Sequence, residues 1–311
     1  MSNRNMYLIS CLGIVFTSGL VYLINDTNTV VNDKFSGFHQ EQFDLPYNLA
    51  SPDTFYLMPK ELKEISGLSF LEPDKVLTIN DEKANLYTYD FTKEEIVSKI
   101  DFGKSGDYES ITRRGSTVYI AESNGNIKVI DLEKGEKVDE YDPPLSSRNN
   151  VEGLCYDATN NQLLIACKGQ LEKKGKSNQL KGIYRFNLEN NELNKEPYKI
   201  IDIKEESKTL KPLNLTNDRL SQLSINSRLK SFAPSGIAIN PISLNTYIIS
   251  FRGGILTVLD PAKNVLGIYF LAKSIYGQPE GITFNKEGDL YISNEARSTT
   301  ANILKIKRRK I

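Results

Sequence analysis

A short opening pattern recurs five times along this chain: an acid or a serine, then glycine or serine, then an aliphatic residue. The five copies are Ser66-Gly67-Leu68, Glu109-Ser110-Ile111, Glu152-Gly153-Leu154, Ser235-Gly236-Ile237 and Glu280-Gly281-Ile282. Each copy precedes a second apolar run, at residues 76–79, 118–121, 163–166, 246–249 and 290–293, and a third run, at residues 85–90, 126–131, 181–187, 254–260 and 301–307. Short strands that repeat about every 40 residues are typical of a β-propeller, in which each small sheet buries its faces against its neighbours.

The outer strands set the predicted number of blades at five. A fourth strand follows the third in the first four repeats, at residues 95–102, 137–141, 198–203 and 264–271, whereas the chain ends at Ile311 before the fifth repeat gains one. A strand-like stretch at residues 54–58 belongs to no repeat. We expect it to be the outer strand of blade five, because this pairing closes the ring and removes an exposed sheet edge.

One long spacing needs a separate explanation. The openings lie 43, 43, 83 and 45 residues apart, so a sixth blade could occupy the third interval. Blade three is already complete by Ile203, however, and residues 217–232 place Ile225, Leu229 and Phe232 on one side of a helix that Asn217 or Asp218 would cap. The pattern therefore predicts an all-β, five-bladed propeller with a short helical insertion after blade three.

The N-terminus predicts a membrane or export segment. Arg4 precedes an uncharged apolar run at residues 6–24, which is long enough to cross a bilayer as a helix. We interpret residues 1–25 as a signal anchor or signal peptide, residues 26–50 as a tether and residues 51–311 as the propeller. A bacterial lipobox at Leu8-Ile9-Ser10-Cys11 is a further alternative. The propeller would then lie on the periplasmic or extracellular side of the cell membrane.

The charge balance argues against a nucleic-acid partner, and the positions of the cysteines argue against a disulfide. The chain has 39 basic and 39 acidic residues, so its formal net charge is zero, and no long-range field favours nucleic acid. Cys155 and Cys167 fall on adjacent predicted strands of blade three, but residue 167 would pair near residue 153. That offset disfavours a disulfide, and both thiols are expected to be small buried groups.

The opening residues are the best candidates for a metal site. Innermost strands line the channel of a propeller, so equivalent positions should form a ring, and we expect the ring to consist of Ser66, Glu109, Glu152, Ser235 and Glu280. Three carboxylates so close together repel one another unless a cation neutralises them, and oxygen ligands without His or Cys suit Ca²⁺. The ends of the second strands would add Asn80, Asp81, Glu122, Asn294 and Glu295 around the channel mouth. The alternative is that each Glu or Ser only caps its own turn.

These openings also resemble a known family. The segments Glu64-Ile65-Ser66-Gly67-Leu68, Tyr108-Glu109-Ser110-Ile111, Val151-Glu152-Gly153-Leu154, Pro234-Ser235-Gly236-Ile237 and Gln278-Pro279-Glu280-Gly281-Ile282, with the late run Gly288-Asp289-Leu290-Tyr291-Ile292-Ser293-Asn294-Glu295, are similar to the SdiA-regulated family of bacterial propellers. The resemblance covers roughly residues 54–307. It implies five blades, an exported or membrane-anchored location and a bound calcium, and it implies no established activity. Ser110 stands where the family usually has glycine.

Two functions are compatible with this pattern. The first is a membrane-tethered, calcium-binding module whose rim binds an unknown protein or small-molecule ligand. The alternative is a calcium-dependent hydrolase of esters, lactones or phosphoesters, because related propeller hydrolases also place a Glu-Gly turn at a channel calcium. The single histidine, His39, precedes the first blade, and no nucleophile elbow or phosphate-binding glycine loop is present. The binding module is therefore favoured, and no catalytic residue is assigned.

Overall fold

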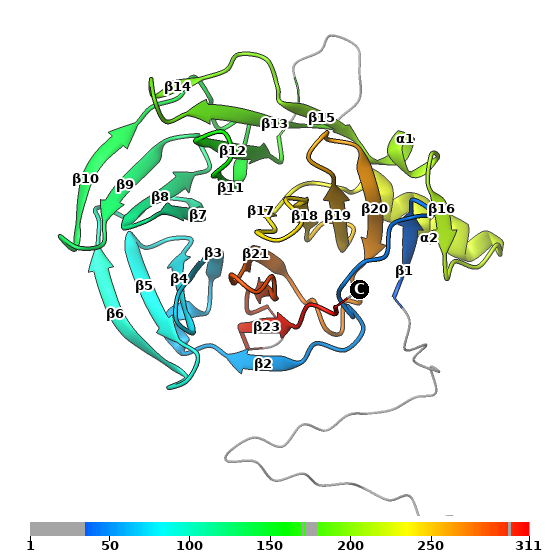
Figure 1. Ribbon diagram of the computed structural model, residues 1–311, viewed down its shortest axis with the longest axis horizontal. Helices are drawn as coiled ribbons and strands as arrows, with labels where there is room; N and C mark the ends of the chain where they lie inside the picture. The colour runs from blue at the N-terminus through cyan, green and yellow to red at the C-terminus, as the bar shows by residue number, and fades with distance from the viewer. Residues whose placement is uncertain (1–34, 170, 172–178, 298–299, 311) are drawn as a thin grey trace, which may run out of the picture. The chain divides into compact units, whose positions relative to one another are not determined.

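Five antiparallel sheets are arranged in a ring around a central axis in the computed structural model, which describes residues 35–169, 171, 179–297 and 300–310 (Figure 1). The innermost strands contact one another in ring order, and the last returns to the first. These strands are β3 (Ile65–Leu71), β7 (Tyr108–Arg114), β11 (Val151–Asp157), β17 (Gly236–Ile239) and β21 (Pro279–Phe284). The prediction of an all-β, five-bladed propeller is confirmed.

Each blade continues outward from its inner strand. Blade one adds β4 (Lys75–Asn80), β5 (Asn85–Asp90) and β6 (Glu95–Asp101), and blade two adds β8 (Thr117–Glu122), β9 (Ile127–Asp131) and β10 (Glu136–Tyr141). Blade three adds β12 (Gln162–Cys167) and β13 (Leu180–Asn187), and both β14 (Glu192–Leu193) and β15 (Lys199–Asp202) pair with β13. The third strands all lie within about two residues of their predicted bounds, because alternation and turn residues define them well.

An early strand of the chain and its last strand complete blade five together, as predicted. This blade contains β21, β22 (Leu290–Asn294), β23 (Asn302–Ile306) and β2 (Thr54–Leu57), which follows residues 40–53 in the chain and precedes the short 3₁₀ helix η1 (Lys60–Leu62). The register runs antiparallel from Thr54 opposite Lys305 to Leu57 opposite Asn302. The outer edge of β23 is therefore covered by an early segment of the same chain.

Residues 35–50 belong to the propeller, so the prediction that the tether extends to residue 50 is wrong. Strand β1 (Ser36–His39) pairs with β20 (Val265–Phe270) and with β16 (Lys211–Leu213). Blade four thereby has six strands, in the order β16, β1, β20, β19 (Ile255–Leu259), β18 (Thr246–Ser250) and β17. Leu45, Tyr47 and Leu49 are almost fully buried in the core of blades four and five. The predicted membrane helix within residues 1–25 lies outside the described residues, and among those described no helix is long and apolar enough to span a membrane.

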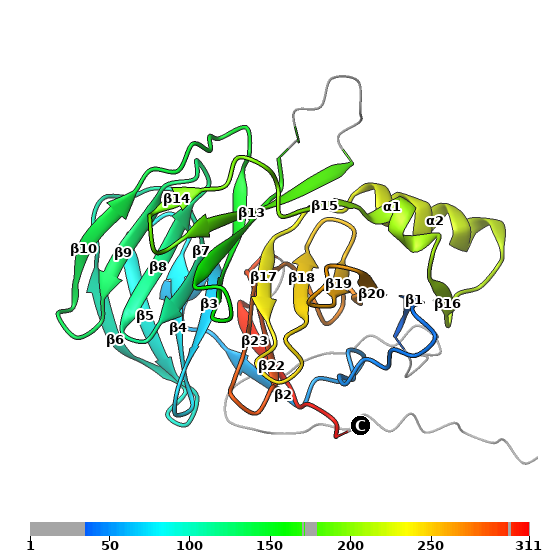
Figure 2. The same ribbon diagram turned by 45° about the horizontal axis from the view of Figure 1, so that its top comes forward.

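The long spacing after blade three contains helices, as predicted, and no sixth sheet is present in the part of the chain that the structure describes. Helices α1 (Ile203–Ser207) and α2 (Arg219–Lys230) lie outside blade four, beside β16 (Figure 2). Asp218 caps α2 by accepting a hydrogen bond from the Ser221 amide, which satisfies a donor that the first turn leaves free. Ile225, Leu229 and Phe232 are buried against blades three and four.

Small residues after the ring positions let successive inner strands approach closely. A Cβ at Gly281 would lie 2.5 Å from the Ser66 carbonyl oxygen, and one at Gly236 would lie 2.7 Å from the Glu280 carbonyl oxygen. Ser110 keeps the same arrangement in blade two, since its buried hydroxyl accepts a hydrogen bond from the Leu154 amide at 2.9 Å. The departure from glycine at position 110 is therefore compatible with the blade geometry. Cys155 and Cys167 are buried free thiols, and residue 167 pairs with Val151, so the predicted offset is confirmed.

Candidate functional site

The inner strands are irregular where the ring residues stand. Register shifts occur at residues 65–68 of β3, 108–110 of β7, 151–153 of β11 and 279–282 of β21. Each shift brackets one opening residue, namely Ser66, Glu109, Glu152 or Glu280. A β-bulge leaves one residue out of the ladder and changes the direction of its side chain. The backbone therefore has a similar irregularity at each of these four opening residues. Ser235 occupies the corresponding position just before β17.

The three ring carboxylates influence one another in a buried environment. Burial, followed by repulsion from Glu152, raises the pKa of Glu109 well above its ordinary value. Burial raises the pKa of Glu280 to about 8, with Glu152 adding a further upward contribution. Glu152 is only 3% exposed, and burial raises its pKa as well. The carboxylates of blades two, three and five therefore lie close enough to affect one another's pKa values.

Lys168 is a cation in this ring that the sequence analysis missed. Its Nζ lies 2.6 Å from Glu152 Oε1, and Asn150 Nδ2 donates to the same oxygen at 2.9 Å. The positive charge of Lys168 also partly opposes the rise in the pKa values of Glu109 and Glu280. The residue follows directly after β12, at the position that Asp81 and Glu295 occupy after β4 and β22. Applying the same second-strand rule to blade three would have found it.

The two ring serines make contacts between blades. Ser66 Oγ donates to the Glu109 carbonyl oxygen at 2.5 Å, and Ser235 Oγ donates to the Pro279 carbonyl oxygen at 2.7 Å. Ser235 Oγ also accepts from the Phe251 amide at 3.1 Å. Both hydroxyls therefore fasten one inner strand to the next, and a metal proposal has to rest on the three carboxylates.

The predicted mouth residues divide into two groups. Asn80 caps its own turn by accepting hydrogen bonds from the Glu82 and Lys83 amides, and Glu122 forms an ion pair with Lys128 at 3.1 Å. The second group comprises Asp81, Asn294 and Glu295, near the junction of blades one and five. Burial, followed by repulsion from Glu64 and Glu295, raises the pKa of Asp81 to about 6.

Several oxygen atoms at this junction have no hydrogen-bond donor. Asp81 Oδ1, Gln278 Oε1 and Asn294 Oδ1 are buried and unpaired among the described residues. The Gln278 Nε2 group donates to both Glu280 Oε1, at 2.8 Å, and Glu295 Oε2. Native proteins leave few buried acceptors unsatisfied, and a bound ion or an ordered water commonly satisfies those that no protein donor reaches. Hydrogen-bond acceptors therefore outnumber donors both in the ring and at the junction of blades one and five.

Calcium fits the donor chemistry of the ring, although the carboxylates do not converge as they stand. No group of three or more acidic, histidine or cysteine side chains within the described residues is arranged to hold a metal ion. Lys168 and Asn150 occupy Glu152 Oε1, and Gln278 occupies Glu280 Oε1. All available ligands are oxygen atoms, which calcium prefers. The three ring carboxylates also outnumber the one nearby cation, Lys168. Binding would require Lys168 to withdraw from Glu152.

A sequence model of the SdiA-regulated family matches residues 57–297, which include the inner strand of every blade and all of the ring. The chain belongs to the SdiA-regulated family. This agrees with the resemblance of the five opening motifs. No curated protein matches the sequence.

Solved structures that are similar to this SdiA-regulated protein have low sequence identity to it. The glutaminyl cyclase of Myxococcus xanthus is 12% identical with a TM-score of 0.55, over 84% of this chain and 97% of that one. A luciferin-regenerating enzyme is 9% identical with a TM-score of 0.49, over 83% of this chain and 95% of that one. A chain of the nidogen/laminin complex is 15% identical with a TM-score of 0.45, over 74% of this chain and 72% of that one. At these identities, the likeness to the cyclase shows the propeller fold alone.

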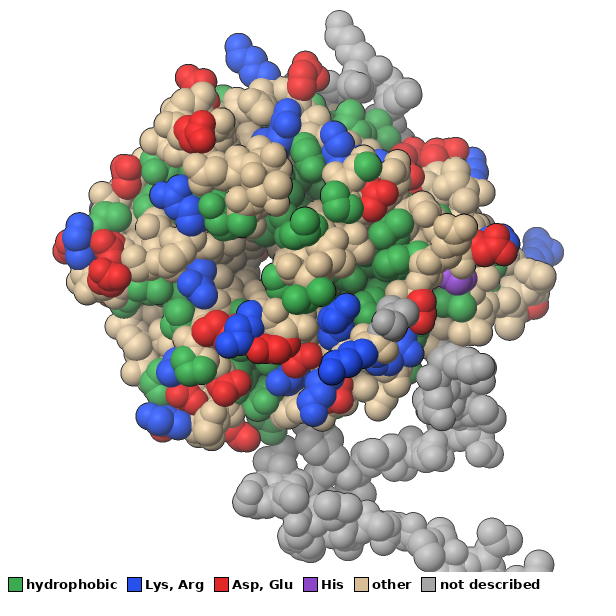
Figure 3. Space-filling model, in the orientation of Figure 1, with side chains coloured by type: hydrophobic (Ala, Val, Ile, Leu, Met, Phe, Trp, Pro, Cys, Tyr) green, Lys and Arg blue, Asp and Glu red, His purple; other side chains and the backbone are tan. Residues whose placement is uncertain are grey.

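The opposite end of the channel has a different character. A pocket of about 260 Å³ is lined by later residues of all five inner strands or the turns that follow them, including Leu68, Ile111, Leu154, Ile237 and Ile282. On the face drawn in Figure 3, hydrophobic side chains gather around the centre of the ring. The acidic ring therefore lies at one end of the channel, and the pocket at the other end combines these aliphatic residues with Glu72, Arg113 and Lys286.

The raised carboxyl pKa values predict a pH-dependent stability in the metal-free protein. Between about pH 4.5 and pH 8, folded Glu280 retains a proton that the unfolded chain releases, so its stabilising contribution is lost as pH rises through that range. We expect the melting temperature in chelator to fall more steeply from pH 5 to pH 9 in the wild type than in Glu280→Gln. Differential scanning calorimetry measures both slopes, with Glu133→Gln as the exposed control. Equal slopes in all three proteins would show that Glu280 titrates normally.

Proposed function

We propose that this protein is a non-catalytic, calcium-binding propeller that acts as a binding module tethered outside the cytoplasm. The observation that carries the proposal is the ring itself, where Glu109, Glu152 and Glu280 come from three different blades and share one nearby lysine. Buried like charges destabilise a fold unless protons or cations neutralise them. A divalent cation bound by all three would convert this repulsion into cross-links between blades.

The ligand set is proposed from chain chemistry. Glu109, Glu152 and Glu280 would supply the charged oxygens, and the unpaired oxygens of Gln278, Asp81 and Asn294 would supply neutral or charged acceptors nearby. Calcium accepts carboxylate, carbonyl and water oxygens in flexible numbers, so an irregular set of this kind suits it better than Mg²⁺. Bound calcium would provide charge neutralisation and would hold the ring rigid. The rim of the propeller would remain available for a ligand.

The location is proposed from the sequence. The uncharged apolar run at residues 6–24 behind Arg4 supports a membrane helix with the propeller on the far side of the bilayer. Calcium is abundant outside the cytoplasm, and weak extracellular sites bind it at 10⁻⁴–10⁻³ M. A modest affinity would therefore suffice for occupancy in that compartment.

Calcium titration tests this proposal directly. We expect isothermal titration of chelator-treated protein to show one calcium site, and we expect calcium at a hundredfold excess over Kd to stabilise the fold by about 2.7 kcal/mol. For a chain of this size that corresponds to an increase in melting temperature of roughly 5–10 °C. Magnesium at the same concentration serves as the control. Absence of both heat and thermal shift with calcium would refute the metal site.

A further inference from the structure

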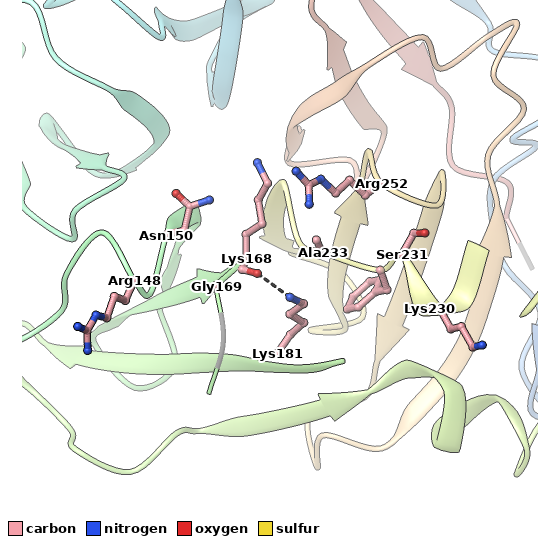
Figure 4. Close-up of a pocket in the computed structure, with 10 residues that line it drawn as sticks. Arg148, Asn150, Lys168, Gly169, Lys181, Lys230, Ser231, Ala233 and Arg252 are labelled. Atoms are coloured by element: carbon pink, nitrogen blue, oxygen red, sulfur yellow. Dashed lines mark hydrogen bonds between the residues drawn. The ribbon is translucent and has the colours of Figure 1, made fainter. Parts of the chain in front are cut away.

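A basic pocket lies beside the acidic ring, between blades three and four (Figure 4). Its volume is about 640 Å³, and five of the residues that line it are basic: Arg148, Lys168, Lys181, Lys230 and Arg252. No aspartate or glutamate of the described residues lines it. The volume is within the usual range for small-molecule sites. This concentration of positive charge is unusual for a chain with no net charge.

Lys181 is the deepest cation of the pocket. Only 6% of the residue is exposed, and its Nζ donates to the Lys168 carbonyl oxygen at 2.6 Å. An ammonium has three N–H donors, so this bond leaves two of them without an acceptor among the described residues. No carboxylate in the described part of the chain forms an ion pair with Lys181. Burial, followed by the charges of Arg252 and Lys168, lowers its pKa, so its surroundings within the protein are unfavourable to a cation.

Arg252 increases the local excess of charge. It follows β18 in an exposed position, and no acidic side chain pairs with it among the residues described. Figure 4 shows its side chain and that of Lys168 pointing into the same region of the pocket, whereas Lys230 points away at the edge. Lys168 pairs with Glu152, whereas Lys181 and Arg252 have no acidic partner among the described residues. The inner cations of the pocket are Lys168, Lys181 and Arg252, and together with the Glu152 carboxylate they carry a formal charge of +2.

The acidic ring does not account for this charge. Its contact with the pocket is the pair of Lys168 and Glu152, with Asn150 hydrogen-bonded to the same carboxylate. Lys181 and Arg252 remain without a counter-ion inside the described part of the protein. A buried, unpaired ammonium is costly to maintain unless a ligand compensates for it.

We propose that this pocket binds a small molecule through a dianionic group, either a phosphate monoester or a dicarboxylate. Lys181 would bind the anion at the base of the pocket as a point charge, and Arg252 would bind it at the entrance, where a planar guanidinium can donate two parallel hydrogen bonds. Phe232 and Ala233 form part of the lining and would contact the carbon skeleton. A dianion matches the formal charge of the three inner cations and Glu152.

This proposal extends the binding role by naming the class of ligand, and it does not depend on calcium. Both the pocket and its charges belong to the chain alone. Anion binding is therefore measured once in chelator and once with calcium. If the anion binds in chelator and no calcium site is found, this proposal stands and the metal proposal fails. If calcium binds and the anion does not, the metal proposal stands and this one fails.

The test is a binding measurement at pH 7.5 and constant low ionic strength. We expect methyl phosphate or succinate to bind with a Kd below about 1 mM in isothermal titration and to raise the melting temperature, and the tighter of the two identifies the source of the anion. Lys181→Met, which keeps the apolar stem, and Arg252→Gln are each expected to weaken that binding at least tenfold. Lys93→Met is the matched control, because Lys93 is exposed on the outer turn of blade one.

Two results would overturn the proposal. One is that neither methyl phosphate nor succinate binds more tightly than the neutral compound succinamide. The other is that Lys93→Met weakens binding as much as Arg252→Gln, since this would show general charge screening instead of a site. Arg252→Gln, at an exposed position, keeps the test decisive if Lys181→Met fails to fold.

Discussion

A protein shortened to residues 63–311 is expected to aggregate, whereas one shortened to residues 35–311 should fold as a soluble monomer. The shorter protein lacks β2, so β23 would present a row of unpaired backbone groups at the edge of blade five. Exposed strand edges of this kind pair with other chains. It also lacks β1, which pairs with β20 in blade four.

The lost core alone is sufficient for this effect. Leu45, Tyr47 and Leu49 are each at most 1% exposed, and Met58 is 5% exposed. Burial of one such side chain contributes about 1.5–3 kcal/mol, so removing four of them approaches the total stability of a typical domain, which is about 5–15 kcal/mol. The Tyr47 hydroxyl additionally donates to the Gly288 carbonyl oxygen at 2.6 Å.

Size-exclusion chromatography and thermal unfolding distinguish the two proteins. A monomeric 63–311 protein that unfolds cooperatively would mean that blade five closes without β2. Aggregation of the 35–311 protein would locate the essential contacts elsewhere. The two shortened proteins differ only in residues 35–62, so a difference in their behaviour shows that this segment closes the propeller.

The repeat pattern was sufficient to predict the ring and its closure. Residues 54–58 were assignable because β23 needed an outer partner, which is a requirement of sheet chemistry. Residues 35–50 were assigned to the tether because Asn, Asp and other polar residues dominate their surroundings. The alternation of Leu45, Tyr47 and Leu49 is a strand-like signal that the polar composition masked.

The site could be predicted only in part, for a related reason. Glu109, Glu152 and Glu280 stand at equivalent positions of three inner strands and affect one another's pKa values, but they are not arranged to hold a metal ion. Lys168 was missed because only oxygen ligands were expected at the mouth, and blade three carries a lysine at that position. The basic pocket combines Lys168, Lys181 and Arg252 from three separate strand ends, and no spacing in a single sequence reveals such a juxtaposition.

Two single substitutions in the ring are expected to change calcium affinity in opposite directions. Glu280→Gln removes one of three shared charges, so we expect calcium to bind at least tenfold more weakly. Lys168→Met removes the ammonium that lies 2.6 Å from Glu152 Oε1 and competes with a metal for that oxygen, so binding should tighten several-fold. A site elsewhere on the surface would respond to neither change.

Glu133→Gln is the control for both, because Glu133 is an exposed acid on the outer turn of blade two. The Glu280→Gln protein should also be more stable than the wild type in chelator at pH 8, since the neutral amide removes a carboxyl group whose pKa is raised by burial. Titration calorimetry and melting curves supply the two readouts. Equal calcium affinities for Glu280→Gln and Glu133→Gln would mean that the ring carboxylates only cap their turns, and weaker binding in Lys168→Met would mean that the lysine supports the metal site and does not compete with it.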